Sequence, residues 1–142
     1  MNAYVDSSFL VSAYITDVHS THVDARLARG FSVWMTPFNS AEVENAIFQQ
    51  VFLNRLSLVE AQRTAADFQR DILAGLWFPV EFPNRAWSTC STLAKQYGPT
   101  LGVRTLDSLH VACALELHAQ KFWTFDERQA KLAEAVGLDT AP

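Results

Sequence analysis

Short apolar runs alternate with longer amphipathic segments along the whole chain, and this alternation limits the folds that the chain can adopt. Strands are predicted over Ala3–Val5, Phe31–Met35, Trp77–Phe82 and Phe122–Phe125, which are apolar runs with β-branched or aromatic residues. The third run is a weak strand because Pro79 has no amide proton to donate to a neighbouring strand. Strands that alternate with helices predict an α/β fold with a mostly parallel central sheet flanked by helices on both faces.

Polar residues, glycines and prolines set the predicted helix boundaries. The expected helices cover residues 7–15, 22–28, 40–54, 57–75, 84–97, 105–118 and 127–136. Ser57 and Glu60 fit a capping box, in which each side chain satisfies a free backbone amide at the start of a helix. Gly98-Pro99 is expected to stop one helix, and Gly137 another. Leu138 to Thr140 is a further candidate for a small edge strand.

Length and composition indicate one globular domain spanning residues 1–142. A chain of 142 residues that is 49% hydrophobic and 18% charged can bury a sizeable core, and its composition is not that of a disordered protein. Its formal net charge of −4 does not attract it to nucleic acid as a whole. Contact with nucleic acid would therefore need a local basic stripe or a bound cation.

The cysteines and the N-terminal segment favour a cytoplasmic protein that does not enter a membrane. Cys90 and Cys113 are the only cysteines and form no CxxC pair, which favours reduced thiols. The segment MNAYVDSS has no basic stretch followed by a long apolar run, so we do not expect a signal peptide. No run of eighteen or more apolar residues is present to span a bilayer.

Four acidic residues lie next to apolar runs, where a charge is costly unless it is paired or binds a metal ion. Asp6 and Asp126 are expected at the carboxyl ends of two strands, and Glu42 and Asp107 in the first turns of two helices. Sites in open α/β sheets form in the crevice at the carboxyl ends of the strands. Carboxylates that converge there repel each other, and a hard divalent cation, which prefers oxygen ligands, removes that conflict.

Helix capping is the competing explanation for each acid, because Asp and Glu commonly occupy the first turns of helices. Asp126, which precedes ERQAKLAEA, taken alone favours a cap. Asp107 and Glu42 taken alone fit a cap and a ligand equally well, and Asp6 is harder to explain as a cap only. Four such coincidences in one small chain favour a shared acidic site.

The segments that carry the acids resemble, in the same order, those of a known family. These segments are YVDSSFLVSAY, TPFNSAEVENAIF, RTLDSLHVACALEL and FWTFDERQAKLAEAVGL. Together they resemble PIN-domain proteins, and more narrowly the VapC-type ribonuclease toxins of bacterial toxin–antitoxin pairs. The resemblance implies an endoribonuclease that depends on Mg²⁺ or Mn²⁺ and hydrolyses RNA phosphodiesters. It also implies a homodimer that is neutralised by a small antitoxin protein.

The same resemblance assigns roles to individual residues. Asp6, Glu42, Asp107 and Asp126 fall on the acidic positions of the family. We assign the three aspartates to metal binding, directly or through water, and leave Glu42 as either a ligand or the group that orients the attacking water. Ser8 falls where the family often has a small hydroxyl residue near the metal. Glu44 stands where close relatives often carry a basic residue.

Several residues and functions remain open. Arg104 can contact a phosphate or form a surface ion pair. His110 and Cys113 share a helix face, and a packed core is favoured there over a zinc site; His19 and His22 are expected to be a solvated pair. The four tryptophans are expected to pack in a core or an interface.

The alternatives to a toxin are a non-catalytic interaction module of the same fold and a PIN nuclease that processes RNA as a housekeeping activity.

Overall fold

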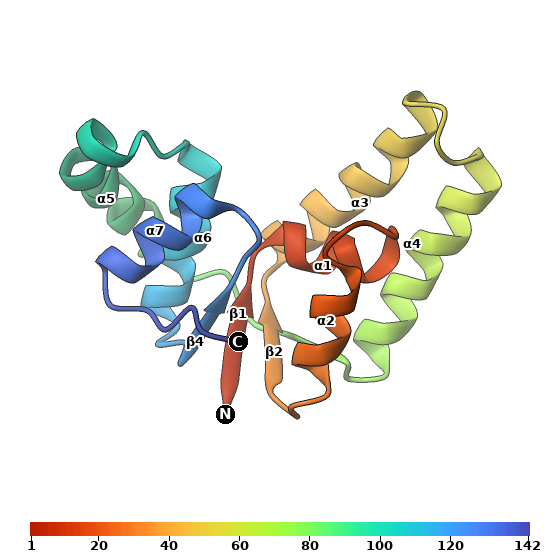
Figure 1. The fold of residues 1–142 in the computed structure, drawn as a ribbon, viewed down its shortest axis with the longest axis horizontal. Helices are drawn as coiled ribbons and strands as arrows, with labels where there is room; N and C mark the ends of the chain where they lie inside the picture. The colour runs from red at the N-terminus through yellow and green to blue at the C-terminus, as the bar shows by residue number, and fades with distance from the viewer.

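A four-stranded parallel sheet forms the centre of the computed structural model, which describes all residues, 1–142 (Figure 1). The strands are β1 (Asn2–Val5), β2 (Ser32–Met35), β3 (Trp77–Pro79) and β4 (Lys121–Trp123). Their order is β3-β2-β1-β4, and every neighbouring pair is parallel. Pro79 lies in an edge strand, where a missing amide proton costs least. The prediction of an α/β fold with a parallel sheet is confirmed.

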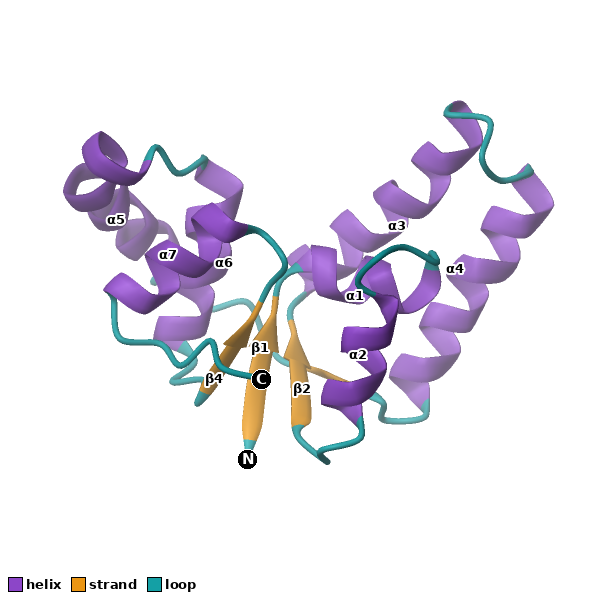
Figure 2. Ribbon diagram, in the orientation of Figure 1, coloured by secondary structure: helices purple, strands orange, loops and turns teal.

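Seven helices cover the two faces of the sheet (Figure 2). They are α1 (Ser7–Tyr14), α2 (Ser20–Leu27), α3 (Pro37–Phe52), α4 (Leu58–Leu73), α5 (Ala86–Leu101), α6 (Thr105–Glu116) and α7 (Glu127–Ala135). Helices α1 to α4 lie on one side, and α5 to α7 lie on the other. None of these helices is both long enough and apolar enough to cross a membrane.

Two hydrophobic cores lie on opposite faces of the sheet because successive side chains of a strand point to opposite sides. Ala3 and Val5 of β1 pack with Phe9 and Ile47 in the core under α1 to α4. Tyr4, between them, faces the other core, which α5, α6 and α7 complete. Helix α6 is buried almost all round, which explains its nearly continuous apolar sequence.

Two predicted helix boundaries are wrong. Helix α3 begins at Pro37 and not at Ser40, because Thr36 caps it and Asn39 completes the capping box. Glu42 therefore lies in the second turn, not the first. Helix α5 continues through Gly98 and Pro99 to Leu101, and it ends where Gly102 adopts a left-handed conformation. Gly98 has no Cβ to clash with the proline ring, so this position tolerates helical backbone.

Three strand predictions also differ from the structure, and the first is β3, which ends at Pro79 and not at Phe82. Strand β4 ends at Trp123, so Thr124 and Phe125 separate it from Asp126. Residues 138–140 add only an isolated bridge, between Asp139 and Lys121, to the edge of the sheet. The Ser57 cap is confirmed, because its side chain accepts a hydrogen bond from the Glu60 amide.

Candidate active site

The four acids approach the same edge of the sheet from different elements. Strands β1, β2 and β4 point to one edge in Figure 2, and α1, α3 and α7 begin just beyond it. Asp6 follows β1 directly, Glu42 lies in α3, Asp107 lies in the first turn of α6, and Asp126 precedes α7. Parallel topology therefore brings residues that are far apart in sequence to one end of the molecule.

Asp6 is a buried carboxylate that has no Lys or Arg partner. Only 6% of the residue is exposed, and it caps α1. Its Oδ1 accepts hydrogen bonds from the Ser8 hydroxyl at 2.7 Å and the Phe9 amide at 3.2 Å. Burial raises the pKa of Asp6, and the nearby His110 and these hydrogen bonds offset part of that rise. Ser8, which the resemblance places near the metal, thus contacts the Asp6 carboxylate.

Glu42 is stabilised in its ionised form by two neighbours. Its Oε1 accepts a hydrogen bond from the Ser7 hydroxyl at 2.7 Å and lies 2.5 Å from Nε2 of His110. Burial alone would raise the pKa of Glu42, but the contacts with His110 and Ser7 outweigh it and leave the pKa lowered. Asp6 and Glu42 thus differ in the direction of their pKa shifts although they lie close to the same histidine.

His110 connects Glu42 to the interior of the protein. The residue is 2% exposed, and its Nδ1 lies 2.9 Å from the Tyr4 hydroxyl. Its ring stacks on Phe38, with 4.3 Å between the ring centroids. The prediction of a buried residue is confirmed, but the sequence argument missed its polar contacts. Asp107 and His110 lie three residues apart on α6, a spacing that places both on one face of the helix and could have indicated a polar role for His110. The apolar residues around His110 favoured the core interpretation instead.

Asp107 and Asp126 share a cationic partner. The Nε of Arg104 lies 2.9 Å from Oδ2 of Asp107, and its Nη2 lies 3.7 Å from Oδ2 of Asp126. Arg104 was expected either to contact a phosphate or to form a surface ion pair, and the structure shows the ion pair. The Arg104 side chain is 70% exposed, so water screens both contacts. Arg104, Asp107 and Glu42 line one cavity of about 340 Å³.

Gln129 ties α7 to α6 beneath these acids. Its backbone amide donates to Oδ1 of Asp126 at 2.9 Å, so Asp126 is the N-cap of α7. Its fully buried side chain donates from Nε2 to the Asp107 carbonyl at 3.1 Å. The Oε1 of Gln129 has no hydrogen-bond partner. No sequence pattern singled out this residue, since it lies inside an otherwise ordinary amphipathic helix.

The carboxylate oxygens of the four acids are chemically suitable ligands for a hard divalent cation. No three His, Cys, Asp or Glu side chains, however, are arranged so that they could hold a metal ion together. Carboxylate oxygens are the preferred ligands of such a cation, and the buried Asp6 lacks a basic partner. Arg104 supplies positive charge between Asp107 and Asp126. A cation held by those two aspartates would have to replace it. The zinc interpretation of His110 and Cys113 lacks a third ligand.

The remaining candidate residues lie away from these contacts. His19 is partly buried and stacks on Phe125 with 4.2 Å between the ring centroids, so the predicted solvated pair with His22 is wrong for His19. Trp77 and Trp123 are buried in the core as predicted, whereas Trp87 is 60% exposed. Both cysteines are buried and free.

Most of the chain matches a known domain family. Residues 3–135 match the PIN domain, so the chain belongs to the PIN-domain family. PIN domains are typically nucleases, and PIN nucleases generally use divalent metal ions. The comparison with curated protein sequences finds no match.

Three solved structures share this fold. The chain is similar to VapC20 of Mycobacterium tuberculosis, described as a toxin that cleaves the sarcin–ricin loop, with a TM-score of 0.70 and 15% identity over 99% of this chain and 98% of that one. It is similar to FitAcB of Neisseria gonorrhoeae, with a TM-score of 0.72, 16% identity and coverage of 99% and 96%. It is also similar to VapBC2 of Rickettsia felis bound to a promoter DNA fragment, with a TM-score of 0.67, 13% identity and coverage of 99% and 98%.

Proposed function

We propose that this protein is a metal-dependent endoribonuclease that hydrolyses RNA phosphodiesters. The observation that carries the proposal is the buried carboxylate of Asp6, which has no basic partner at an edge of the sheet where Glu42, Asp107 and Asp126 also gather. Membership of the PIN-domain family supports the same chemistry. A protein of net charge −4 would need local positive charge to hold an RNA phosphate, and a bound cation supplies it.

Each acid has a role in this proposal. Asp6, Asp107 and Asp126 would hold Mg²⁺ or Mn²⁺, which when bound lowers the pKa of a water molecule and neutralises charge on the scissile phosphate. Glu42 is ionised and orients water or adds one ligand oxygen. Ser8 fixes the direction of the Asp6 carboxylate. Arg104 is exposed beside the same cavity and contacts a phosphate oxygen once it leaves the aspartates.

We further propose that the protein is the toxin of a bacterial toxin–antitoxin pair and acts in the cytoplasm. The support is the similarity in structure to VapC20, FitAcB and VapBC2. Their sequences are 13–16% identical to this chain, which is enough to support a shared fold but does not identify an RNA target. A small antitoxin that presents Arg or Lys to the acids would compete with the metal by charge pairing.

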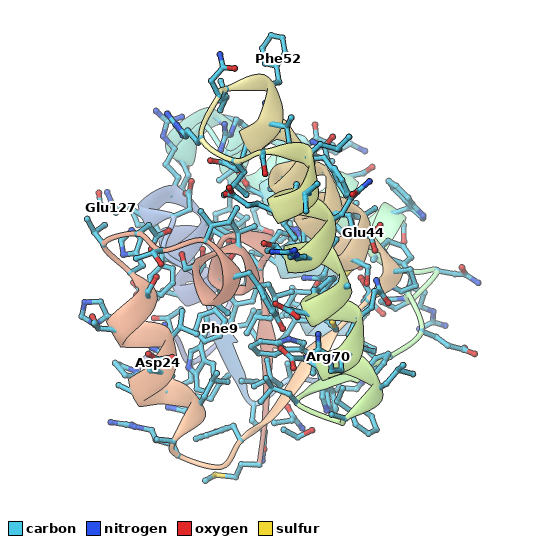
Figure 3. All side chains as sticks on the ribbon, turned by 90° about the vertical axis from the view of Figure 1, so that its right-hand side faces the viewer. Phe9, Asp24, Glu44, Phe52, Arg70 and Glu127 are labelled. Carbon is cyan, nitrogen blue, oxygen red and sulfur yellow. The ribbon has the colours of Figure 1, made fainter.

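An exposed apolar surface on the α3–α4 hairpin supports a homodimer. Phe52 is 83% exposed and projects from the tip of the hairpin (Figure 3). Leu58 and Val59, at the start of α4, are each more than half exposed. Exposed apolar side chains gathered on one helical hairpin are typical of a protein–protein interface.

The test is cleavage of a labelled RNA by the purified protein. We expect cleavage with Mg²⁺ or Mn²⁺, loss with EDTA, and return when the ion is restored. Expression of the chain alone should arrest growth, and expression of Asp6→Asn should not. RNA that stays intact with folded protein and either ion would reject the nuclease and favour the non-catalytic interaction module. Metal-dependent cleavage without growth arrest would favour a nuclease with a housekeeping role in RNA processing.

A further inference from the structure

Polar and stacking contacts fix the ring of His110. Its Nε2 lies 2.5 Å from Oε1 of Glu42, its Nδ1 lies 2.9 Å from the Tyr4 hydroxyl, and its face stacks on Phe38. The Tyr4 hydroxyl is itself held by Asn39, whose side chain also donates to the Val5 carbonyl at 2.7 Å. The imidazole therefore links strand β1, helix α3 and helix α6 through polar groups that are almost completely buried.

The two oxygens of Glu42 are in different situations. Oε1 accepts from the Ser7 hydroxyl at 2.7 Å and contacts His110, whereas Oε2 has no hydrogen bond from the protein. Glu42 lines the cavity that Asp107 and Arg104 also line. One carboxylate oxygen is thus used by the protein, and the other is free for a water molecule, a cation or the substrate.

The hydrogen-bonding chemistry requires a proton on Nε2 of His110. An ionised carboxylate oxygen only accepts, so the ring nitrogen that faces it at 2.5 Å must donate. The single proton of the Tyr4 hydroxyl goes either to a bare Nδ1, in place of Asn39, or to Asn39 while the hydroxyl accepts from a protonated Nδ1. Both the neutral and the charged ring therefore keep Nε2–H directed at Glu42, and the contact does not depend on the charge of the imidazole.

We propose that His110 is a positioning residue that, with Ser7, occupies Oε1 of Glu42, so that Glu42 acts on the reaction through Oε2 alone. This inference rests on the proposed function, because it assigns how one of the proposed site residues acts. It leaves both roles open to Glu42 but limits each of them to one carboxylate oxygen. A carboxylate with one available oxygen suits orientation of a water molecule or single-oxygen ligation, and it disfavours bidentate metal binding.

The kinetic test separates positioning from packing. His110→Leu keeps bulk but removes the donor, and His110→Gln keeps an N–H near the position of Nε2. We expect His110→Leu to lower kcat on the order of tenfold to a hundredfold with KM unchanged, as loss of an outer-shell partner typically does. His110→Gln should recover most of that loss. His118→Gln, at an exposed histidine past the end of α6, is the matched control and should leave cleavage unchanged.

A double-mutant comparison identifies the residue through which His110 acts. In a Glu42→Gln background, His110→Leu should lower kcat no further, because the group that it positions is already altered. Equal losses from His110→Leu in both backgrounds would overturn the proposal. His110→Gln as inactive as His110→Leu, with both proteins folded, would also overturn it.

A third measurement uses the wild-type protein and needs no catalysis. Long-range ¹H–¹⁵N NMR correlations of the His110 ring should find Nε2 protonated at neutral pH, and Glu42→Gln should shift that resonance more than His118→Gln does. An unprotonated Nε2 would overturn the proposal even in an active enzyme. If RNA is not cleaved but Nε2 is protonated and coupled to Glu42, the contact stands and only the nuclease assignment fails.

Discussion

The acids form two pairs whose charges are compensated in different ways. In the β1–α3 pair, Asp6 and Glu42 are held by hydroxyls, a backbone amide and a histidine. In the α6–α7 pair, Asp107 and Asp126 share the guanidinium of Arg104. Only the β1–α3 pair contains a buried carboxylate without an Arg or Lys partner. A metal ion bound at this edge would therefore supply charge that the β1–α3 pair lacks, whereas at the α6–α7 pair it would compete with a cation already present.

The largest effect should follow the loss of charge at Asp6. Asp6→Asn should lower RNA cleavage on the order of a thousandfold, as loss of a group that stabilises charge in an active site does. The fold should survive, because asparagine caps a helix as well as aspartate and accepts the same hydrogen bonds from Ser8 and Phe9. Asp24→Asn, at an exposed position in α2, is the control and should retain activity. Full activity of Asp6→Asn would reject the assignment of this residue.

The pH dependence of stability should have opposite signs within the β1–α3 pair. The pKa of Asp6 is raised by burial, so its stabilising contribution is present below the ordinary value of 3.8 and is lost as pH rises through the raised value. Metal-free Asp6→Asn should therefore melt above wild type at pH 7, on the order of 3 °C, and the difference should close in acid.

Glu42 should behave in the opposite way. Burial raises its pKa, but His110 and Ser7 outweigh that effect, so stability from Glu42 is present above the ordinary value of 4.5 and is lost as pH falls through the lowered value. Glu42→Gln should melt below wild type at pH 7 and approach it in acid. Melting curves across pH test both variants together. A shift of the same sign for both would mean that the histidine does not distinguish the two carboxylates.

The competition at the α6–α7 pair is tested by removing its guanidinium. Arg104→Gln frees Asp107 and Asp126, so the Mn²⁺ concentration needed for half of the thermal stabilisation should fall on the order of threefold, a small factor because exposed ion pairs are weak. Arg70→Gln is a matched control, since Arg70 pairs with Asp67 at the same spacing on α4, away from the acids. An unchanged Mn²⁺ response in Arg104→Gln would mean that the guanidinium and the ion do not compete.

The fold was predictable because the spacing of apolar residues and the positions of turn residues mark each strand and helix within a short stretch of sequence. The alternating strands and helices were placed correctly, since each buries its apolar side against the sheet. The errors came from local exceptions at two prolines. Pro37 begins α3 because Thr36 and Asn39 form a cap there, and Pro99 is tolerated because Gly98 precedes it. Neither outcome follows from the general rule that a proline ends a helix.

The site was less predictable than the fold because its contacts join distant segments. His110 was expected to be an ordinary core residue, since its neighbours on α6 are apolar, and its contacts with Glu42 and Tyr4 span 68 and 106 positions. The contacts of Arg104 were open, because an ion pair depends on the angle at which α7 approaches α6. The sequence indicated which residue types meet at the sheet edge, while the pairing of their charges required coordinates.

The smallest effect should follow the loss of charge at Asp126, which is both a helix cap and a proposed metal ligand. Asp126→Asn keeps an oxygen that accepts from the Gln129 amide, so metal-free stability should change by less than about 0.5 kcal/mol. The stabilisation by Mn²⁺ should nevertheless shrink, because a ligand charge is lost. Melting curves with and without Mn²⁺ measure both quantities.

A second cap provides the control for this last comparison. Ser57→Ala removes the cap of α4, at the outer end of the α3–α4 hairpin, and should cost about 1 kcal/mol while leaving the Mn²⁺ response unchanged. If Asp126→Asn instead melts clearly below wild type and responds to Mn²⁺ as wild type does, Asp126 is only a cap. The divalent ion would then be held by the β1–α3 pair and Asp107, and Arg104 would have no competitor at Asp126.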